Sequence, residues 1–419
     1  MSVEKHVPEI RFEGFSGEWE KIKFSEIFNE KDGIRRGPFG GSIKKEMFVA
    51  KSDYVVYEQR NAIYDRYDTR YNISKEKYQE LINFSLASGD FIMSGAGTIG
   101  RVSRVPDDVK QGVFNQAIIR MKINDERVDS EFFLQWIRSE KMQERLTESN
   151  PASAMVNLVP MSELKAWSVE VPNKDEQIAI GNTFQKLDAL ISQHHQKHNK
   201  LSSIKKAMLE KMFPKQGETN PEIRFKGFSG EWETSTLGCL VSFYKGKGLP
   251  KSSIQDDGIY SCVHYGELFT KYSEVIDLVT SRTNQSDSFF SMPNDVLMPT
   301  SDVTPKGLVK PCCVKQSGIV LGGDILVIRP NNQNVIDGSF LSRFIRAREQ
   351  QVLQNVTGST VFHLYASSIE GLGIVFPSID EQKVITNHFQ KLDALINQHQ
   401  QQIIKLNNIK QACLSKMFV

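Results

Sequence analysis

Three short patterns in the sequence have residue types that could carry out chemistry. Gly95 to Gly100 reads Gly-Ala-Gly-Thr-Ile-Gly, the glycine spacing of a dinucleotide-binding turn. Such a turn must open a helix, but Arg101 to Pro106 alternates like a strand and ends in proline. Asn150-Pro151-Ala152-Ser153 contains only half of the Asn-Pro-Pro-aromatic motif expected of an enzyme that methylates adenine. Neither pattern favours a catalytic site.

The third pattern, Pro106 to Lys110, has the acids and lysine of a nuclease. Its charged residues are crowded into one turn, whereas a nuclease spreads them over a sheet to bind metal, so we expect a solvated hairpin loop. The sequence also has no Gly-x-x-x-x-Gly-Lys-Ser/Thr loop, and we expect no hydrolysis of ATP by this chain.

The cysteines and histidines do not have the spacing of a metal site. There are neither Cys-x-x-Cys pairs nor histidine partners at zinc spacing around Cys239, Cys262, Cys312, Cys313 and Cys413, so we expect buried or inert thiols. His194 and His399 occupy matching positions in two similar segments, which would allow a metal pair. A neutral imidazole at a partly buried seam is the commoner case, and we predict no metal.

Two copies of one long helix organise the chain. Asp175 to Gln196 and Asp380 to Gln401 are identical at 16 of 22 aligned positions, which indicates duplication. Apolar residues at spacings of four, three and four predict a coiled-coil seam, which the following segments extend through Ile204, Met208 and Met212 and through Ile409, Cys413 and Met417. The predicted helix-pairing residues are Ile180, Phe184, Leu187, Ile191 and Leu201 in the first copy, and Ile385, Phe389, Leu392, Ile396, Ile403 and Leu406 in the second. Each helix should run roughly 38 residues, or about 57 Å, and pack antiparallel against the other.

A short tag opens each repeat. Pro8 to Glu20 reads PEIRFEGFSGEWE and returns at Pro221 to Glu233 with 12 of 13 positions identical. Between tag and helix, residues 21–171 and 234–376 share a hydrophobic pattern but few identities. Parts with a common structural role therefore stayed alike after duplication, and parts with distinct targets diverged.

The two middle regions are predicted to be mixed α and β domains of about 150 residues. Strand-like runs at 54–57, 90–93 and 117–123 precede a helical pattern at 130–147 in the first, and runs at 295–298 and 324–329 precede one at 338–356 in the second. Each region closes with a strand and a proline, at 168–172 and 373–377, and enters its long helix through Pro-x-x-Asp-Glu-Gln. Asp175 and Asp380 are the predicted N-caps, so this motif is interpreted as a helix start and not as a catalytic dyad.

The predicted order of segments is therefore a repeat of tag, domain and helix. We divide the chain into a tag at 1–20, a first domain at 21–171, a spacer helix at 172–213, a linker and second tag at 214–233, a second domain at 234–376 and a second spacer helix at 377–419. The fold class is α/β, mixed α+β: two globular domains separated by two long helices packed as an antiparallel coiled coil, with an internal pseudo-two-fold repeat.

Composition is that of an ordinary globular protein. The chain has 419 residues, 24% of them charged, and its net charge of +2 is too small to name a nucleic-acid partner, so any DNA binding must come from local patches. Its start lacks an apolar signal core, and no stretch has the ~18 uncharged apolar residues that a membrane span needs. We expect a cytoplasmic protein with no membrane partner.

Together these features resemble the specificity subunit of a type I restriction-modification enzyme, and the resemblance covers essentially the whole chain. It rests on the openings at Pro172 and Pro377, the two Phe-Gln-Lys-Leu-Asp-Ala-Leu-Ile helices and the tags with Trp19 and Trp232. The turns at 37–42 and 89–100 are also similar to turns common in that family.

The resemblance implies a DNA-recognition protein that catalyses nothing itself. Each target-recognition domain would bind one half of a bipartite, asymmetric site in double-stranded DNA. Two methyltransferase subunits would modify adenines, and restriction and translocation subunits would cleave unmodified DNA. S-adenosylmethionine, Mg²⁺ and ATP would be bound by those partners, with no cofactor on this chain.

Loops rich in Arg, Lys, amide and hydroxyl side chains are the candidates for contacts to phosphates and base edges. The candidate DNA-binding residues are Arg35, Arg36, Gln59, Arg60, Asn61, Ser94 and Thr98 in the first domain, and Lys245, Lys247, Lys251, His264, Tyr265, Ser301, Lys306, Thr360 and His363 in the second. The second domain has PTSDVTPKGLV at 299–309 where the first has its glycine turn, so contacts do not transfer from one domain to the other.

Two other classes of function are compatible with parts of the pattern. A single-chain modification or restriction enzyme is disfavoured because its chemical motifs are absent. A coiled-coil scaffold without a nucleic-acid role would leave the two divergent domains unexplained. The recognised bases and their spacing do not follow from residue types, because recognition depends on loop geometry and DNA shape as well.

Overall fold

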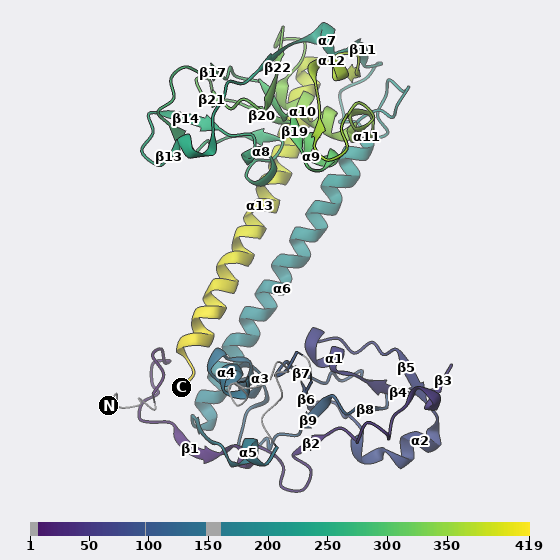
Figure 1. Ribbon diagram of the computed structural model, residues 1–419, viewed down its shortest axis with the longest axis vertical. Helices are drawn as coiled ribbons and strands as arrows, with labels where there is room; N and C mark the ends of the chain where they lie inside the picture. Colours follow the sequence, from purple (N-terminus) through teal and green to yellow (C-terminus); the bar gives the residue numbers. More distant parts are fainter. Residues whose placement is uncertain (1–6, 97, 148–160) are drawn as a thin grey trace. The chain divides into compact units, whose positions relative to one another are not determined.

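The computed structural model describes residues 7–96, 98–147 and 161–419, which form two compact units (Figure 1). The first unit contains residues 1–195 and 401–419, and the second contains residues 196–400. Each unit thus combines one mixed α/β domain with the beginning of one long helix and the end of the other. No helix among the described residues has the length and apolar character needed to span a membrane.

The first unit has, among its described residues, ten strands and several short helices before its long helix. The strands are β1 (Glu20–Lys23), β2 (Ile34–Arg36), β3 (Phe48–Val49), β4 (Tyr54–Tyr57), β5 (Tyr71–Ile73), β6 (Phe91–Ser94), β7 (Val102–Arg104), β8 (Gly112–Phe114), β9 (Ile118–Met121) and β10 (Ser168–Val171). The helices are η1 (Phe24–Ile27), η2 (Lys45–Met47), α1 (Gln59–Tyr64), α2 (Lys75–Glu80), η3 (Ile82–Phe84), α3 (Ser130–Arg138), α4 (Glu140–Thr147) and α5 (Met161–Ala166).

The second unit has a related but longer series of elements. Its strands are β11 (Glu233–Thr236), β12 (Val241–Lys245), β13 (Ile254–Gln255), β14 (Tyr260–Val263), β15 (Val275–Ile276), β16 (Arg282–Thr283), β17 (Phe289–Phe290), β18 (Val296–Pro299), β19 (Ser301–Asp302), β20 (Cys312–Val314), β21 (Val320–Leu321), β22 (Ile325–Pro330), β23 (Phe362–His363) and β24 (Gly373–Phe376). Its helices are α7 (Leu237–Leu240), η4 (Lys251–Ser253), α8 (Glu267–Thr270), α9 (Pro305–Leu308), α10 (Gly338–Ala347), α11 (Glu349–Leu353) and α12 (Ala366–Ile369). The long helices are α6 (Lys174–Lys211) and α13 (Ile379–Lys416).

The two domains share one framework of sheets. A first sheet has the order β2-β9-β6-β7 in one domain and β12-β22-β18-β20-β15 in the other. A second sheet has the order β3-β5-β4-β8 in one and β13-β16-β14-β21-β17 in the other, and the pairs β4–β8 and β14–β21 are both parallel. The predicted repeat of mixed α/β domains is therefore confirmed at the level of strand order.

Each tag closes its domain onto the start of a long helix. β1 pairs antiparallel with β10, and β11 pairs in the same way with β24. Arg11 donates to both carboxylate oxygens of Glu176 at 2.6 and 2.7 Å, and Arg224 does so to Glu381 at 2.7 and 2.7 Å. Both glutamates are only 1% exposed, so each buried carboxylate is held by a bidentate ion pair with the tag.

The glutamine of each Asp-Glu-Gln motif also has a structural role. The side chain of Gln177 accepts from Asp129 N at 2.8 Å and donates to Pro172 O at 2.8 Å, and Gln382 repeats both bonds with Asp337 and Pro377. The interpretation of the motif as a helix start is confirmed.

The predicted N-cap, Asp175, lies two residues after the observed one. The helix begins at Lys174, and Asn173 Oδ1 accepts from Glu176 N at 2.9 Å, so Asn173 supplies the capping oxygen. Asp380 is likewise inside α13, which begins at Ile379. Both aspartates lie in the first turn, where their charge suits the helix dipole.

Within each unit the two long helices run antiparallel, as predicted. In the first, Asp188 contacts Lys410 and, further toward the start of α6, Phe184 stacks on Phe418, just beyond the end of α13. In the second, Lys205 contacts Asp393, and Phe213 beyond the end of α6 stacks on Phe389 near the start of α13. Moving toward one end of α6 therefore means moving toward the opposite end of α13.

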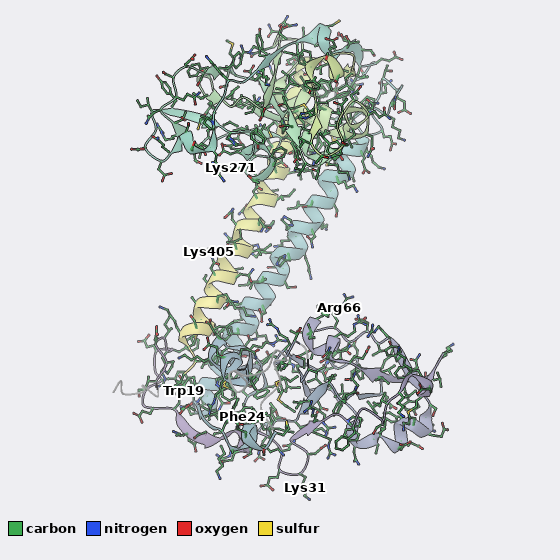
Figure 2. All side chains as sticks on the ribbon, viewed as in Figure 1. Trp19, Phe24, Lys31, Arg66, Lys271 and Lys405 are labelled. Atoms are coloured by element: carbon green, nitrogen blue, oxygen red, sulfur yellow. The ribbon has the colours of Figure 1, made fainter. Side chains whose placement is uncertain are left out.

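The apolar seam differs from the prediction in what it packs against. Ile180 and Phe184 belong to the core of the first domain, with Trp19, Phe24 and Trp136, rather than to a seam made by the two helices alone. Figure 2 labels Trp19 and Phe24 in this domain. Ile385, Phe389 and Leu392 likewise belong to the core of the second domain. The predicted pairing residues Leu187, Ile191, Leu201, Ile396 and Leu406 are half-buried, and Ile403 is buried.

Two predicted extensions of the seam are wrong. Ile204 and Ile409, at equivalent positions, are exposed, because the buried stripe passes instead through Leu209 and Leu414 against the domain cores. Met208 and Cys413 pack beside those residues, and Met212 and Met417 are buried, as predicted.

The predicted helices at 130–147 and 338–356 are each broken in two. Ser139 has extended backbone angles between α3 and α4, and its hydroxyl donates to Trp136 O at 2.7 Å. Arg348 separates α10 from α11, and its guanidinium donates to Pro214 O. Phe133, Trp136, Ile137 and Leu146 are all buried, so the predicted apolar face is confirmed although the helix is not continuous.

Candidate nucleic-acid interface

Arg36 and Lys245 occupy equivalent positions at one edge of the first sheet in each domain. Arg36 ends β2 and Lys245 ends β12, and each of these strands pairs with an equivalent neighbour. The next residue is glycine in both: Gly37 N donates to Ile118 O at 2.9 Å, and Gly246 N donates to Ile325 O at 2.9 Å. Both cationic side chains are exposed. The fold thus presents one cation at the same edge of each domain.

The glycine after each cation permits a close approach between backbones. A Cβ at Gly37 would lie 1.9 Å from Asn115 O, and one at Gly246 would lie 2.0 Å from Gly322 O. Any larger residue would displace the strand, so glycine fixes the position of Arg36 and Lys245 relative to the neighbouring loop.

A cavity lies beside each of these cations. In the second domain it has a volume of about 650 Å³, and its lining includes Lys245, Ser301, His363, Tyr244 and Tyr365. Three candidate DNA-binding residues therefore converge there, from β12, β19 and β23. Ser301 and His363 are brought together by antiparallel pairing of β19 with β23.

The cavity in the first domain is smaller and more apolar. It has a volume of about 490 Å³ and is lined by Arg36, Phe39, Phe84, Gln116 and Ser42, together with Gly37, Pro38 and Gly40. Of these residues Arg36 is a candidate predicted from the sequence, whereas Phe39 and Gln116 are not. An aromatic residue within a glycine-rich turn was the signal that could have identified Phe39.

Arg35 is held inside its domain. Its Nε donates to Asp32 Oδ1 at 2.9 Å, and the same carboxylate contacts the buried Arg120 at 2.5 Å and Lys122 at 3.3 Å. Burial opposes ionisation of Asp32, but the hydrogen bond from Arg35 and the charges of Arg120 and Lys122 outweigh it, and its pKa is lowered. Arg35, predicted from the sequence as a phosphate contact, is already paired with Asp32. The neighbouring Arg36 is therefore the better candidate for a phosphate contact.

Asn61 and Ser94 do not present polar atoms to a ligand. Asn61 is buried: its Oδ1 accepts from Glu58 N at 2.8 Å, and its Nδ2 donates to Arg66 O and Asp68 O at 2.7 and 3.0 Å. Ser94 is also buried, and its hydroxyl donates to Thr98 O and accepts from Arg101 N. Both predictions of DNA contacts are corrected, because these groups stabilise a turn and a hairpin instead.

The remaining candidates of the first domain lie on its surface. Arg60 pairs with Asp68 at 2.8 Å, and Gln59, at the start of α1, is half-buried. Thr98 is exposed in the turn after β6. That turn leads into strand β7, so the predicted strand after the glycine turn is confirmed. Gly97 and the Asn150-Pro151-Ala152-Ser153 pattern lie outside the described residues.

The other candidates of the second domain fall into two groups. Lys251, Lys306 and Thr360 are exposed. Lys247 pairs with Asp287, and His264 accepts from Gly266 N at 3.1 Å while its ring packs on Tyr265 with centroids 4.5 Å apart. Lys247, His264 and Tyr265 thus have partners within the domain, and none of the three lines the cavity beside Lys245.

The turn after the central strand differs between the domains, as the sequence indicated. In the first domain β6 and β7 form a hairpin. In the second, β18 is followed by β19 and the short helix α9, which carries Lys306. A Cβ at Gly307 would lie 1.3 Å from Asp302 Oδ2, so a larger residue there would displace the Asp302 side chain. The two domains therefore present different surfaces on the same framework.

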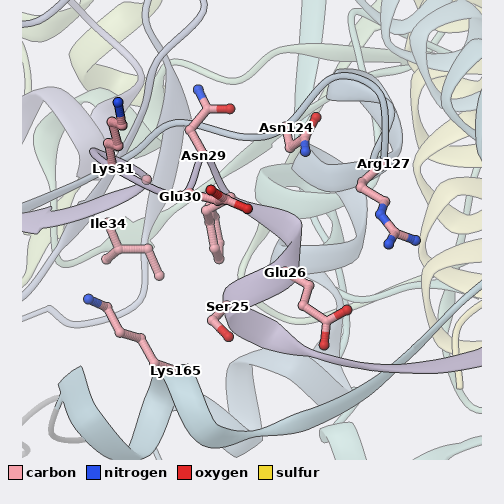
Figure 3. Close-up of a pocket in the computed structure, with 11 residues that line it drawn as sticks. Ser25, Glu26, Asn29, Glu30, Lys31, Ile34, Asn124, Arg127 and Lys165 are labelled. Atoms are coloured by element: carbon pink, nitrogen blue, oxygen red, sulfur yellow. The ribbon is translucent and has the colours of Figure 1, made fainter.

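A third cavity, of about 530 Å³, lies near the other end of β2 (Figure 3). Two carboxylates, Glu26 and Glu30, and three cations, Lys31, Arg127 and Lys165, line it. Its mixed charge does not resemble the surface around Arg36, and it contains none of the candidate DNA-binding residues.

Three of the five cysteines are buried, in agreement with the prediction. Cys262, Cys312 and Cys313 are buried, and burial raises the pKa of Cys262 and of Cys313 to about 11. Cys239 differs, because its side chain is exposed.

Comparison with known proteins gives a consistent result. The family described as type I restriction modification DNA specificity domain matches residues 16–203 and again residues 229–408. A type I restriction enzyme MjaX specificity subunit from Methanocaldococcus jannaschii is 19% identical over 334 residues, covering 76% of this chain and 75% of the relative.

Solved structures show the same fold. The S subunit of a type I restriction-modification system from M. genitalium superimposes with a TM-score of 0.65 at 16% identity, covering 99% of both chains. A chain from a study of complex assembly and conformational transition of the type I R-M system has a TM-score of 0.52 at 16% identity, covering 94% of this chain and 96% of that one. With two matched regions that take up most of its length, the chain belongs to the family of type I restriction-modification DNA specificity domains.

Proposed function

We propose that each domain of this specificity subunit reads one half of a bipartite, asymmetric site in double-stranded DNA. The observation that carries the proposal is the equivalence of Arg36 and Lys245. A cation at the same sheet edge in both domains suits the phosphates common to any duplex. The loops around it differ, as the contacts to distinct bases require.

Exchange of one domain tests this assignment. Residues 21–171 are replaced by the corresponding region of a relative that recognises another sequence, and the methylated sites of the host are sequenced. One half-site should change and the other should stay. A change in both half-sites would contradict independent reading by the two domains.

The same proposal assigns the chemistry to partner subunits. The chain itself would bind no cofactor, while methyltransferase subunits bind S-adenosylmethionine and methylate adenine, and restriction subunits use Mg²⁺ and ATP to cleave. The assignment is supported by the structural use of Glu176 and Gln177 and by the strand that follows the Gly95 turn. Incubation of the purified chain with duplex DNA and labelled S-adenosylmethionine tests it, and methyl transfer by this chain alone would contradict it.

Two methyltransferase subunits are proposed because the long helices expose apolar side chains in duplicate. Leu190 on α6 and Leu395 on α13 are equivalent and both exposed, and the same is true of Ile204 and Ile409. Each unit contains one residue of each pair, which suits one partner per unit. Leu190→Glu and Leu395→Glu should each remove one methyltransferase subunit from the assembly in native mass spectrometry, and the double variant should remove both. Lys405→Ala, at an exposed position on α13, is the control.

A further inference from the structure

Phe39 has the largest exposed fraction among the large apolar side chains of the described residues, at 92%. Burial of an aromatic ring of this size is favourable, so the exposed ring is available to gain free energy by contact with a partner. Phe39 also lines the cavity of about 490 Å³ beside Arg36, together with Phe84 and Gln116.

The loop that carries Phe39 has a fixed base. Gly37 is bonded to Ile118 O, and its backbone is packed so closely on Asn115 that no side chain fits. Ser42 N donates to Phe39 O at 2.8 Å, which closes the turn. The ring is therefore presented at a defined place next to Arg36.

The surrounding charge points to a polyanion. Residues 34–51 contain five cations, Arg35, Arg36, Lys44, Lys45 and Lys51, and one acid, Glu46, a net charge of +4 in a chain whose total is +2. Arg36, Lys44, Lys45 and Lys51 are all exposed. A basic segment around an apolar ring matches a duplex, which has charged phosphates outside and stacked apolar base faces inside.

We propose that Phe39 inserts between base pairs of the half-site bound by the first domain and unstacks them. This rests on the proposed function, since it assigns a residue to the DNA contact of that domain. The phenyl ring has no donor or acceptor with which to read base edges, but it can stack on a base whose neighbour it has displaced. Specificity then includes the cost of deforming a particular base step, which is lowest at flexible pyrimidine–purine steps.

The second domain has no equivalent ring. Counting from the equivalent glycines Gly37 and Gly246, the position of Phe39 corresponds to Gly248, and the next residue, Leu249, is buried at 4% exposure. The inserted ring is thus confined to one half-site, and the other half-site serves as an internal control.

Fluorescence of 2-aminopurine, scanned through each half-site of the cognate duplex, tests the inference on the chain assembled with its methyltransferase subunits. The wild type should increase the fluorescence at one step of the first half-site, and Phe39→Ala should abolish that increase and weaken binding roughly 10-fold to 100-fold. Phe39→Trp should restore both. Any increase at the methylated adenine should persist in Phe39→Ala, since it comes from the partner. Ile259→Ala, at a 71% exposed position in the second domain, is the matched control.

Three outcomes would overturn the inference. If Phe39→Ala leaves fluorescence and affinity unchanged on DNA that the wild type binds specifically, the inserted ring is contradicted and the proposed function is not. Weaker assembly with the methyltransferase subunits at unchanged DNA affinity would place the ring against protein. Failure of the wild-type assembly to bind any duplex specifically would overturn the proposed function and this inference with it.

Discussion

Lys205 Nζ on α6 lies 2.7 Å from Asp393 Oδ1 on α13, and the equivalent Lys410 lies 2.6 Å from the equivalent Asp188. Each lysine thus reaches across to the aspartate of the repeated Phe-Gln-Lys-Leu-Asp-Ala-Leu-Ile segment on the opposite helix. The surroundings of the two pairs differ. Lys205 also contacts Glu274 at 2.9 Å, and Asp393 also contacts the buried Arg343 at 3.0 Å, whereas the Asp188 side chain is 43% exposed.

We predict that Lys205→Ala destabilises the protein more than Lys410→Ala. Removing Lys205 leaves two largely buried carboxylates with one fewer cation, at a cost of about 2–4 kcal/mol. Removing Lys410 breaks a single pair with a partly exposed carboxylate, at a cost below about 1 kcal/mol. Urea unfolding of the two variants, followed separately for each unit by a local probe, measures the difference. Equal losses of stability would show that the additional ion pair of Lys205 does not stabilise the fold.

The same cluster predicts a dependence on pH. Burial raises the pKa of Glu274, but Lys205 lowers it further through charge and hydrogen bonding, and the net shift is below the ordinary value of 4.5. A carboxyl whose folded pKa is lowered contributes stability above its unfolded pKa and loses it as the pH falls through the folded value. The free energy of unfolding should therefore decrease as the pH is lowered from about 4.5. In Glu274→Gln this decrease should be smaller, and the free energy of unfolding at about pH 7 should be lower than in the wild type. An unaltered acid profile in Glu274→Gln would contradict the assignment.

Arg11→Ala should be strongly destabilising. It leaves Glu176, 1% exposed, as a buried charge without its bidentate partner, and breaking such a pair costs roughly 3–5 kcal/mol. Arg224→Ala should have a similar effect through Glu381. Arg66→Ala is the control, because its side chain is 72% exposed and 3.6 Å from Asp68. Thermal unfolding measures all three, and a small shift for both tag variants would mean that the tags are not anchors.

The salt dependence of DNA binding should distinguish Arg36 and Lys245 from Arg35. Removal of one cation that binds a phosphate lowers the slope of log K against log salt by about 0.9 for a duplex. Arg36→Ala and Lys245→Ala should each have this effect with little change in stability. Arg35→Ala removes a cation from Asp32 and should lower the melting temperature instead. Fluorescence anisotropy over a range of salt measures the slopes, and Lys405→Ala should leave the slope unchanged.

The helix pair is predicted to set the gap between the half-sites. The end of α6 is a poor place for an insertion, because Lys205 is an ion-pair partner and Met212 and Phe213 are buried in the core of the second domain. Gln196 and Gln401 are equivalent, lie outside both domain cores and are the better sites. Seven residues inserted after each glutamine form about two helical turns and lengthen each helix by about 10.5 Å. This length corresponds to about three base pairs at 3.4 Å per step.

Methylome sequencing of a host with the double insertion measures the outcome. Both half-site sequences should be retained and the gap between them should lengthen by about three base pairs. Insertion in one helix alone, as a control, should prevent the pairs Lys205–Asp393 and Lys410–Asp188 from forming together and reduce stability. Retained methylation with an unchanged gap would show that the helices do not determine the distance.

The sequence by itself determined the repeat, the long helices and many strands. The identity between the two segments that begin with Asp-Glu-Gln is visible in the sequence alone. The spacing of their apolar residues depends only on residues close together in the chain. The predicted strand at 54–57 is β4, with the same bounds, and the strands closing each domain are β10 and β24. Such features are local, so the pattern along the chain is sufficient to find them.

Only the tertiary structure decided which polar residues are available to a ligand. Arg35 and Arg36 are neighbours of the same charge, yet Asp32, Arg120 and Lys122 surround only the first. The equivalence of Arg36 with Lys245 depends on hydrogen bonds from Gly37 to Ile118 and from Gly246 to Ile325, residues far away in the chain. Side-chain availability follows from what packs around a residue after strands distant in sequence have paired, and residue type and spacing do not contain that information.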